Sequence, residues 1–194
     1  MALTDEDFKT IEELGSAYPQ EWISNKGLVP YIKRHGEKLK GIEIGTCRGE
    51  STAYFLDKCP NVELLTTIDP YKGYQDWNGE ITQETVDRFM EVAQKNLERF
   101  GERVVMLREE SVNAADKFED ESVDFIFVDG DHSYDATLAD CIRYYPKLKK
   151  GGIFCGHDYQ TIEGVRTAVD EYRAKYKITS PINLSLNSAF FWYK

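Results

Sequence analysis

The sequence predicts a single α/β domain with a doubly wound, mostly parallel sheet. Short apolar segments alternate with longer segments of helical periodicity along most of the 194 residues, which is the pattern of repeated strand–helix–strand units. The length and the 41% of apolar residues suit one globular domain with a substantial core. We expect a Rossmann-like sheet of seven strands.

The N-terminal residues do not share this alternation. A helix is predicted over Thr4–Ala17, from a start resembling a capping box and from partial helical periodicity, and Pro19 ends it. A short helix is predicted over Leu28–Arg34. Residues 1–37 are therefore expected to form an N-terminal helical extension or lid, and residues 38–194 the α/β domain.

The elements of the α/β domain are defined by apolar patterning and by glycines at their ends. The predicted strands are Gly41–Gly45, Val62–Ile68, Arg103–Leu107, Val123–Val128 and Gly152–Gly156, followed by two C-terminal candidates, Ile178–Leu186 and Ala189–Tyr193. The predicted helices are Gly49–Asp57, Thr82–Phe100, Ser111–Phe118, Tyr134–Leu148 and Glu163–Tyr176. A loop rich in aromatic residues is predicted over Tyr71–Asn78, and it could form an adenine wall, an acceptor pocket or a hydrophobic flap over the core.

Composition disfavours several classes of protein. The formal net charge of −10 argues against binding of nucleic acid, which requires clustered Lys and Arg. No apolar run reaches the roughly 18–20 residues that span a bilayer, and the acidic N-terminus has no apolar signal-peptide core. Four cysteines show no zinc or redox spacing, so reduced, mostly buried thiols and a cytoplasmic location are expected.

Polar and acidic residues follow each of the first five predicted strands. They are Glu43, Asp69, the run Glu109–Glu110–Ser111, the run Asp129–Gly130–Asp131–His132 and the pair His157–Asp158. Open parallel sheets bind ligands outside the carboxyl ends of their strands. This concentration of acids is therefore the strongest indication of a functional site in the sequence.

The first strand-to-helix turn contains two glycines, Gly45 and Gly49, in the spacing G-x-x-x-G. The dinucleotide fingerprint needs G-x-G-x-x-G. Because Cys47 stands where that fingerprint has its second glycine, NAD and FAD are disfavoured. Asp69 ends the second strand, and a carboxylate there can accept hydrogen bonds from a ribose diol. A plain tight turn is the alternative interpretation of the glycines taken alone, but together these features favour a nucleoside ligand.

Four segments carry a family resemblance: Glu43-Ile44-Gly45-Thr46-Cys47-Arg48-Gly49 with Ser51; Thr67-Ile68-Asp69; Asp124 to Tyr134, containing Asp-Gly-Asp-His-Ser-Tyr; and Lys150-Gly151-Gly152 leading to His157-Asp158-Tyr159. In this order and spacing they resemble the class I S-adenosylmethionine-dependent methyltransferases. More closely, they resemble the small bacterial-type O-methyltransferases related to metal-dependent sugar and catechol O-methyltransferases. The resemblance covers about residues 38–194.

The resemblance implies a site for S-adenosylmethionine. Glu43 would neighbour the methionine amino group, and Ser51 would lie close to the methionine carboxylate. Asp69 would bind the ribose hydroxyls. The remaining cofactor-binding residues implied are Gly45, Thr46 and Gly49 in the turn, Glu110 and Ser111 by the adenine, and Asp129. Glu110 stands where relatives often have a different pair.

The resemblance also implies where methyl transfer occurs. A hydroxyl is a poor nucleophile near pH 7, so a base or a metal ion must help remove its proton. The similar metal-dependent enzymes place ligands at the positions of Asp129, His157 and Asp158, a set that suits Mg²⁺ or Mn²⁺. His157 departs from the usual carboxyl or amide ligand. A hydrogen-bonded turn without a metal is the alternative interpretation.

The catalytic residues implied are Asp131 and His132. Either could be the base, and the resemblance favours Asp131. The expected activity is methyl transfer from S-adenosylmethionine to a hydroxyl of a small molecule, such as a sugar or a natural-product intermediate. The alternatives are a non-catalytic nucleoside-binding module or partner subunit, and an NAD-linked oxidoreductase, which the missing fingerprint disfavours. A homodimer is an option for the assembly.

Overall fold

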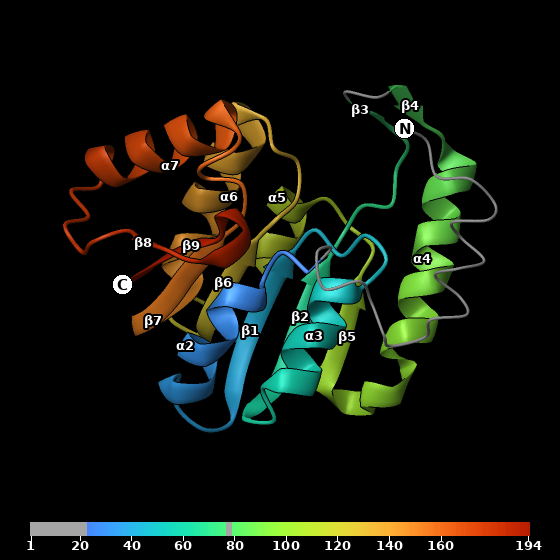
Figure 1. The fold of residues 1–194 in the computed structure, drawn as a ribbon, viewed down its shortest axis with the longest axis horizontal. Coiled ribbons are helices and arrows are strands. Elements are labelled where there is room, and N and C mark those ends of the chain that lie inside the picture. Colours follow the sequence, from blue (N-terminus) through green and yellow to red (C-terminus); the bar gives the residue numbers. More distant parts are fainter. Residues whose placement is uncertain (1–22, 77–78) are drawn as a thin grey trace.

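The structure, a computed structural model, describes residues 23–76 and 79–194. Its centre is a seven-stranded sheet in the order β5-β2-β1-β6-β7-β9-β8 (Figure 1). The strands are β1 (Leu39–Ile44), β2 (Val62–Ile68), β5 (Val104–Leu107), β6 (Val123–Val128), β7 (Leu148–Gly156), β8 (Asn183–Leu184) and β9 (Phe190–Tyr193). All of them run parallel except β9, which pairs antiparallel with both of its neighbours. The predicted fold class is confirmed.

Helices cover both faces of the sheet (Figure 1). One face carries α2 (Val29–His35), α3 (Glu50–Lys58) and α4 (Gln83–Leu97), and the other carries α5 (Ser111–Ala114), α6 (Tyr134–Tyr144) and α7 (Glu163–Lys175). Short 3₁₀ turns connect several elements: η2 (Lys26–Leu28), η3 (Glu98–Arg103), η4 (Ala115–Lys117), η5 (Tyr145–Lys147) and η6 (Leu186–Ser188). Side chains alternate along each strand, so two apolar clusters form, one on each face.

Several predicted elements are wrong in their extent, and three of them show why. The expected aromatic loop contains a small hairpin, β3 (Tyr74–Asp76) paired with β4 (Gly79–Ile81). The helix predicted to reach Leu148 ends earlier, because Pro146 interrupts it and Leu148 already pairs with Val123 in the sheet. The long C-terminal strand predicted from Ile178 reduces to the two residues of β8.

Residues that the sequence assigned to the N-terminal extension pack against the α/β domain. Leu28, Val29 and Ile32 are buried in the same apolar cluster as Phe55 and Leu65. This part of the chain therefore shares the core of the domain. The predicted helix at residues 4–17 lies outside the described residues. Within the described residues, no helix is long and apolar enough to cross a membrane.

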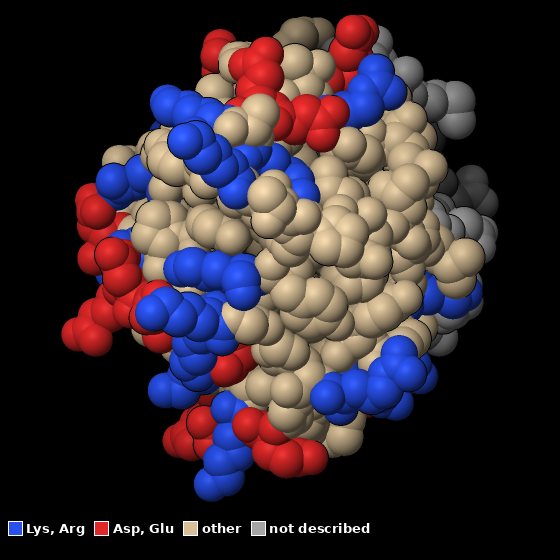
Figure 2. All heavy atoms as spheres, turned by 90° about the vertical axis from the view of Figure 1, so that its left-hand side faces the viewer, with Lys and Arg blue, Asp and Glu red and all other residues tan. Residues whose placement is uncertain are grey.

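One side of the molecule carries the free edge of the sheet. Figure 2 shows this side, where α7, β8 and the C-terminus lie, with uncharged surface in the middle and mixed Lys, Arg, Asp and Glu around it. Among the described side chains, several apolar ones are exposed on elements of this side: Tyr176, Leu184, Leu186 and Tyr193. The acidic residues that follow the strands lie elsewhere, at the carboxyl edge of the sheet.

Candidate active site

The sheet places the predicted site residues on one edge. The last residues of β1, β2 and β6 are in register, since Ile44 pairs with both Ile68 and Val128. The ladder continues one residue further, because the Asp129 amide donates to the Ile44 carbonyl at 2.8 Å and the His157 amide to the Val128 carbonyl at 3.1 Å. The backbone at these positions is therefore anchored by the hydrogen bonds of the central strands.

The glycine turn lies directly against the loop after β6. Gly45 has a φ of +94°, and a Cβ atom there would lie 2.1 Å from the carbonyl oxygen of Asp129. Only glycine can adopt this conformation at such close approach. Gly49 has a φ of +80° and faces Leu97 of α4. Both glycines thus have a packing role in addition to the cofactor role that the resemblance implies.

Asp69 accepts hydrogen bonds from the glycine turn. Its Oδ2 accepts from the Thr46 amide at 3.2 Å and the Cys47 amide at 2.9 Å, and its Oδ1 accepts from the Tyr71 amide at 2.8 Å. Tyr71 is 2% exposed and its hydroxyl donates to the Cys47 carbonyl at 3.0 Å. Asp69, which is predicted to bind the ribose, and the glycine turn are therefore joined in one hydrogen-bonded unit.

The aromatic residues of the loop after Asp69 differ in burial. Tyr71 belongs to a buried cluster with Val86 and Phe89 of α4, which fits the interpretation of the loop as a hydrophobic flap over the core. Tyr74 is 53% exposed on β3. Trp77 lies outside the described residues. The predicted adenine wall or acceptor pocket therefore stays a prediction for the outer part of this loop.

Glu43 lies beneath the turn, between the sheet and α3, and is fully buried. Its Oε2 accepts a hydrogen bond from the Thr52 hydroxyl. Burial raises the pKa of Glu43 to about 8, and hydrogen bonds from Thr52 and Thr67 oppose this only in part. The carboxyl group is therefore mostly protonated at neutral pH, and its predicted contact with a methionine amino group would be made from a buried position.

The predicted adenine end contains a buried carboxyl group that the sequence analysis missed. Glu110 is partly exposed and pairs with Lys72 at 2.5 Å. The Ser111 hydroxyl donates to Asp140 Oδ1 at 2.6 Å, and the Tyr144 hydroxyl donates to the Ser111 carbonyl at 2.6 Å. Asp140 is 2% exposed, and burial raises its pKa to about 7. Nothing in the local pattern of α6 distinguishes Asp140 from a surface acid.

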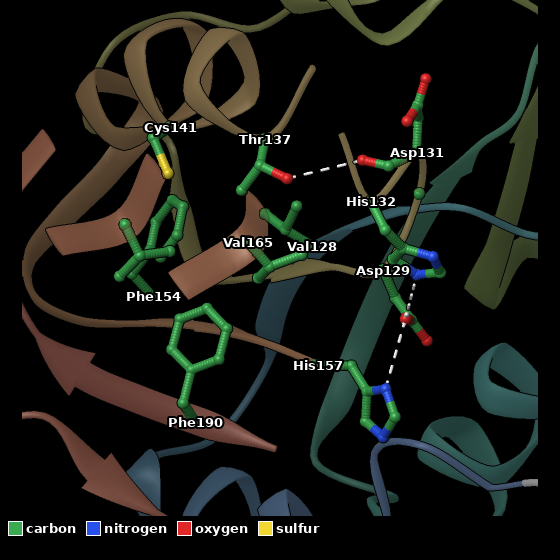
Figure 3. Close-up of a pocket in the computed structure, with 12 residues that line it drawn as sticks. Val128, Asp129, Asp131, His132, Thr137, Cys141, Phe154, His157, Val165 and Phe190 are labelled. Atoms are coloured by element: carbon green, nitrogen blue, oxygen red, sulfur yellow. Dashed lines mark hydrogen bonds and ion pairs between the residues drawn. The ribbon is translucent and has the colours of Figure 1, made fainter. Parts of the chain in front are cut away.

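The metal ligands implied by the resemblance, Asp129, His157 and Asp158, lie close together, and His132 joins Asp129 and Asp158. Figure 3 shows the Asp129 carboxylate between the imidazoles of His132 and His157. Nε2 of His132 lies 3.6 Å from Asp129 Oδ1 and 3.3 Å from Asp158 Oδ2. Nδ1 of His157 lies 3.7 Å from Asp129 Oδ1 and 2.9 Å from Asp158 Oδ2. We call Asp129, His132, His157 and Asp158 the Asp–His cluster. Two carboxylates thus face two imidazoles.

Electrostatics within the Asp–His cluster favour its charged forms. Burial alone would lower the pKa of His132, but the carboxylates of Asp129 and Asp158 outweigh it and raise the pKa. Burial opposes ionisation of Asp158, yet hydrogen bonds from His157 and Thr161, with the charges of the imidazoles, lower its pKa to about 2. The carboxyl group of Asp158 is therefore ionised at neutral pH, and the carboxylates favour the protonated form of His132.

Asp131 and His132, the two candidates for the base, face different ways. Asp131 is exposed, and Figure 3 shows its carboxylate directed away from Asp129 and His157. Its Oδ1 accepts from the Ser133 amide at 2.8 Å, just before α6. His132 faces the Asp–His cluster instead. The structure therefore separates a solvent-facing carboxylate from an imidazole that two carboxylates engage.

A short segment before the predicted domain crosses this edge of the sheet. The Ser24 hydroxyl lies 2.8 Å from the Ser51 hydroxyl and donates to Asp129 Oδ2 at 2.6 Å. Asn25, which is fully buried, donates to the Ser51 carbonyl at 2.7 Å. Neither residue is predictable from the sequence, because no motif surrounds them and their partners lie 26 to 105 positions away.

Left-handed backbone conformations are frequent at this edge. Seven non-glycine residues of the described chain have positive φ, and three of them are Cys47, Tyr71 and Asp158. Such conformations are uncommon and gather at functional sites. Cys47 is an exposed residue, whereas Cys59, Cys141 and Cys155 are buried, so most of the cysteines are buried, as predicted.

Comparisons with known proteins agree with this arrangement. A family model described as a methyltransferase domain matches residues 42–159, which is more than half of the chain. A curated relative, the uncharacterized protein y4gI of Sinorhizobium fredii (strain NBRC 101917 / NGR234), is 31% identical over 125 residues. That match covers 63% of this chain and only 13% of y4gI.

Solved structures share the fold at low identity. The O-methyltransferase NovP superposes with a TM-score of 0.62 at 16% identity, with 96% of this chain and 97% of NovP covered. The O-methyltransferase from Bacillus cereus in complex with SAH has a TM-score of 0.61 at 16% identity, with 100% of this chain and 93% of that chain covered. At this identity the likeness establishes the fold alone.

The chain belongs to the methyltransferase domain family, as its sequence resemblance predicted. The seven-stranded sheet, the glycine turn after β1 and the acids at the strand ends are consistent with that family.

Proposed function

We propose that the protein transfers a methyl group from S-adenosylmethionine to a hydroxyl group of a small molecule, with a divalent cation assisting. The single observation that carries this proposal is the bridge through Ser24, whose hydroxyl contacts both Ser51 and Asp129. Ser51 is the predicted contact of the methionine carboxylate, and Asp129 belongs to the Asp–His cluster. The predicted donor end and the cluster therefore adjoin.

Polar atoms around the first turn of α3 support donor binding there. Glu43 Oε1 and Asn25 Oδ1 are buried without a hydrogen-bond partner among the described residues. Unsatisfied buried polar atoms are costly, and each needs an explanation such as a ligand or an ordered water. Both lie against the turn that carries Ser51, since Asn25 bonds Ser51 and Glu43 bonds Thr52.

The Asp–His cluster fits a divalent cation by the chemistry of its donor atoms. Ligand atoms of Asp129, His132 and Asp158 all lie within 4.8 Å of one another, and His157 lies beside both carboxylates. Two carboxylates with imidazole nitrogen suit Mg²⁺ or Mn²⁺, and nitrogen favours Mn²⁺. We propose that Asp129 and Asp158 hold the cation together with His157, as the resemblance implies, or with His132.

The residues of the chain then have separate tasks in the proposed reaction. When bound, S-adenosylmethionine supplies the reactive methyl group, and a cation lowers the pKa of the acceptor hydroxyl. Asp69 and Ser51 orient the donor, and alignment of donor and acceptor is the main requirement of an in-line displacement. We assign the removal of the proton from the acceptor hydroxyl to Asp131, whose exposed carboxylate points away from the cluster (Figure 3), toward the solvent from which an acceptor enters.

Product formation tests this proposal. The protein is incubated with S-adenosylmethionine and panels of hydroxylated sugars and phenols, with Mn²⁺ or with a chelator, and S-adenosylhomocysteine is quantified. We expect product only when an acceptor is added, with turnover at least tenfold lower in chelator. Asp131→Ala should retain S-adenosylhomocysteine binding and lose turnover. Methylation of amine or thiol acceptors with hydroxyl acceptors left unchanged would contradict the proposal.

The matched control for Asp131→Ala is Asp135→Ala. Asp135 is also exposed and lies at the start of α6, but it is outside the Asp–His cluster and its loop. We expect this variant to keep full turnover. Equal losses in the two variants would show that the effect arises from α6 and not from a base.

A further inference from the structure

The hydrogen bonds of Ser24 have a defined direction. An ionised carboxylate only accepts hydrogen bonds, so the single Ser24 proton is donated to Asp129, 2.6 Å away. Ser51 must then be the donor in the 2.8 Å hydrogen bond between the hydroxyls of Ser51 and Ser24. The chain of donors therefore runs from Ser51 through Ser24 to Asp129.

The segment that carries Ser24 is anchored on both sides of this chain of donors. Ile23 is 1% exposed and packs with Ala53 and Leu97. On the other side, the Gly27 carbonyl accepts a hydrogen bond from the Ser185 hydroxyl at 2.8 Å. Because both flanks are fixed, the Ser24 hydroxyl keeps its position between α3 and the end of β6.

Ser24 also sets the orientation of the Asp129 carboxylate. Oδ2 of Asp129 is used by Ser24, whereas Oδ1 faces the nitrogens of His132 and His157 at 3.6 and 3.7 Å. Rotation of the carboxylate would break the short bond from Ser24. One oxygen is thus reserved for the chain of donors and the other for the Asp–His cluster.

We propose that Ser24 is a positioning residue that couples the donor end of the site to the cation end, so that filling one end strengthens binding at the other. This inference rests on the proposed function. Ser51 can donate to a methionine carboxylate only by turning its proton away from Ser24. A hydroxyl that no longer accepts a hydrogen bond is a weaker donor, so Ser24 then holds Asp129 less strongly and leaves it more available to a cation.

The coupling also acts from the cation end to the donor end. A cation at Asp129 withdraws electron density from the carboxylate and weakens the bond that Ser24 donates. The Ser51 hydroxyl is then freed for the donor. Coupling between two binding sites is reciprocal and typically amounts to about 5- to 150-fold in affinity. We expect a value near the lower end, since a single chain of hydroxyls transmits it.

Calorimetric titration with S-adenosylhomocysteine, without and with saturating Mn²⁺, measures this coupling directly. In the wild-type protein we expect Mn²⁺ to tighten binding by about fivefold or more. In Ser24→Ala the two dissociation constants should agree within about twofold. Ser24→Thr keeps the hydroxyl and should retain most of the wild-type ratio.

Thr161→Ala is the matched control. The Thr161 hydroxyl donates to Asp158 Oδ1 at 2.6 Å, so this variant removes a hydroxyl from the other carboxylate of the cluster without touching Ser51. We expect weaker Mn²⁺ binding with the coupling ratio unchanged at saturating Mn²⁺. A ratio that falls equally in Thr161→Ala and Ser24→Ala would overturn the specific role of Ser24.

Two further outcomes are distinguishable. If wild-type protein binds S-adenosylhomocysteine with the same affinity with and without Mn²⁺, or if Ser24→Ala keeps the wild-type ratio, the coupling is refuted and the proposed function stands. If wild-type protein does not bind S-adenosylhomocysteine under either condition, the proposed function itself fails. Thermal unfolding of each variant separates both cases from misfolding.

Discussion

Replacing Asp140 with Asn should change how the stability of the protein depends on pH. Asp140 is 2% exposed, accepts a hydrogen bond from Ser111, and has a pKa raised to about 7 by burial. Its ordinary value is 3.8. Between these two pH values the unfolded chain is ionised at Asp140, whereas the folded protein retains the proton. The folded state therefore loses stability as the pH rises.

The size of this effect follows from the two pKa values. One pKa unit corresponds to about 1.36 kcal/mol, so the full separation corresponds to about 4 kcal/mol. Part of this contribution to the free energy of unfolding has already been lost at pH 5. Between pH 5 and pH 8 we therefore expect a loss of about 3 kcal/mol from this group. Asn cannot ionise, so Asp140→Asn should gain about that amount relative to wild type over this interval.

Urea unfolding of both proteins at pH 5 and pH 8 measures the difference, and only the change between the two pH values enters. Asp135→Asn is the control, because Asp135 is exposed on the same helix. We expect its difference from wild type to be the same at both pH values. A stability difference between Asp140→Asn and wild type that is independent of pH, or that shifts in favour of wild type from pH 5 to pH 8, would refute the reasoning.

Two further predictions concern the glycine turn. Gly45→Ala should destabilise the protein by about 2–5 kcal/mol, because the added Cβ meets the Asp129 carbonyl and alanine must adopt a left-handed backbone conformation. The control is Gly151→Ala, which should cost only about 1–2 kcal/mol, because Gly151 has a φ of +78° but open space around it. Equal costs of the two substitutions in urea unfolding would contradict the packing argument. Tyr71→Phe removes the hydroxyl that donates to the Cys47 carbonyl and should lower the free energy of unfolding by about 0.5–1.5 kcal/mol. An unchanged free energy of unfolding would show that this hydrogen bond does not stabilise the turn.

The sequence predicted the core of the sheet better than its margins. The ranges Val62–Ile68 and Val123–Val128 are strands β2 and β6 without any change of boundary, because continuous runs of apolar and β-branched residues define a buried parallel strand locally. The start of β7 at Leu148 was missed, since it depends on pairing with Val123 and not on local propensity.

The same division applies to the site. Asp69, Asp129 and His157 were predictable because the topology brings the residue after each parallel strand to one edge. Ser24 and Asp140 were not, because each acts through a partner distant in the sequence, Asp129 for Ser24 and Ser111 for Asp140. Only the folded chain shows that Ser24 bridges Ser51 and Asp129 and that Asp140 is a buried carboxyl group.

The central claim is that the edge after β1, β2 and β6 binds the methyl donor, and Asp69 tests it most directly. Calorimetric titration with S-adenosylhomocysteine should show one site per wild-type chain. Asp69→Asn keeps one oxygen for the Thr46 and Cys47 amides. It loses the acceptor of the Tyr71 amide and the charge that strengthens two hydrogen bonds to a ribose diol. At about 1.4 kcal/mol per bond the affinity should fall on the order of 100-fold. Absence of binding to wild type at millimolar concentration, or equal affinity in Asp69→Asn, would contradict the account.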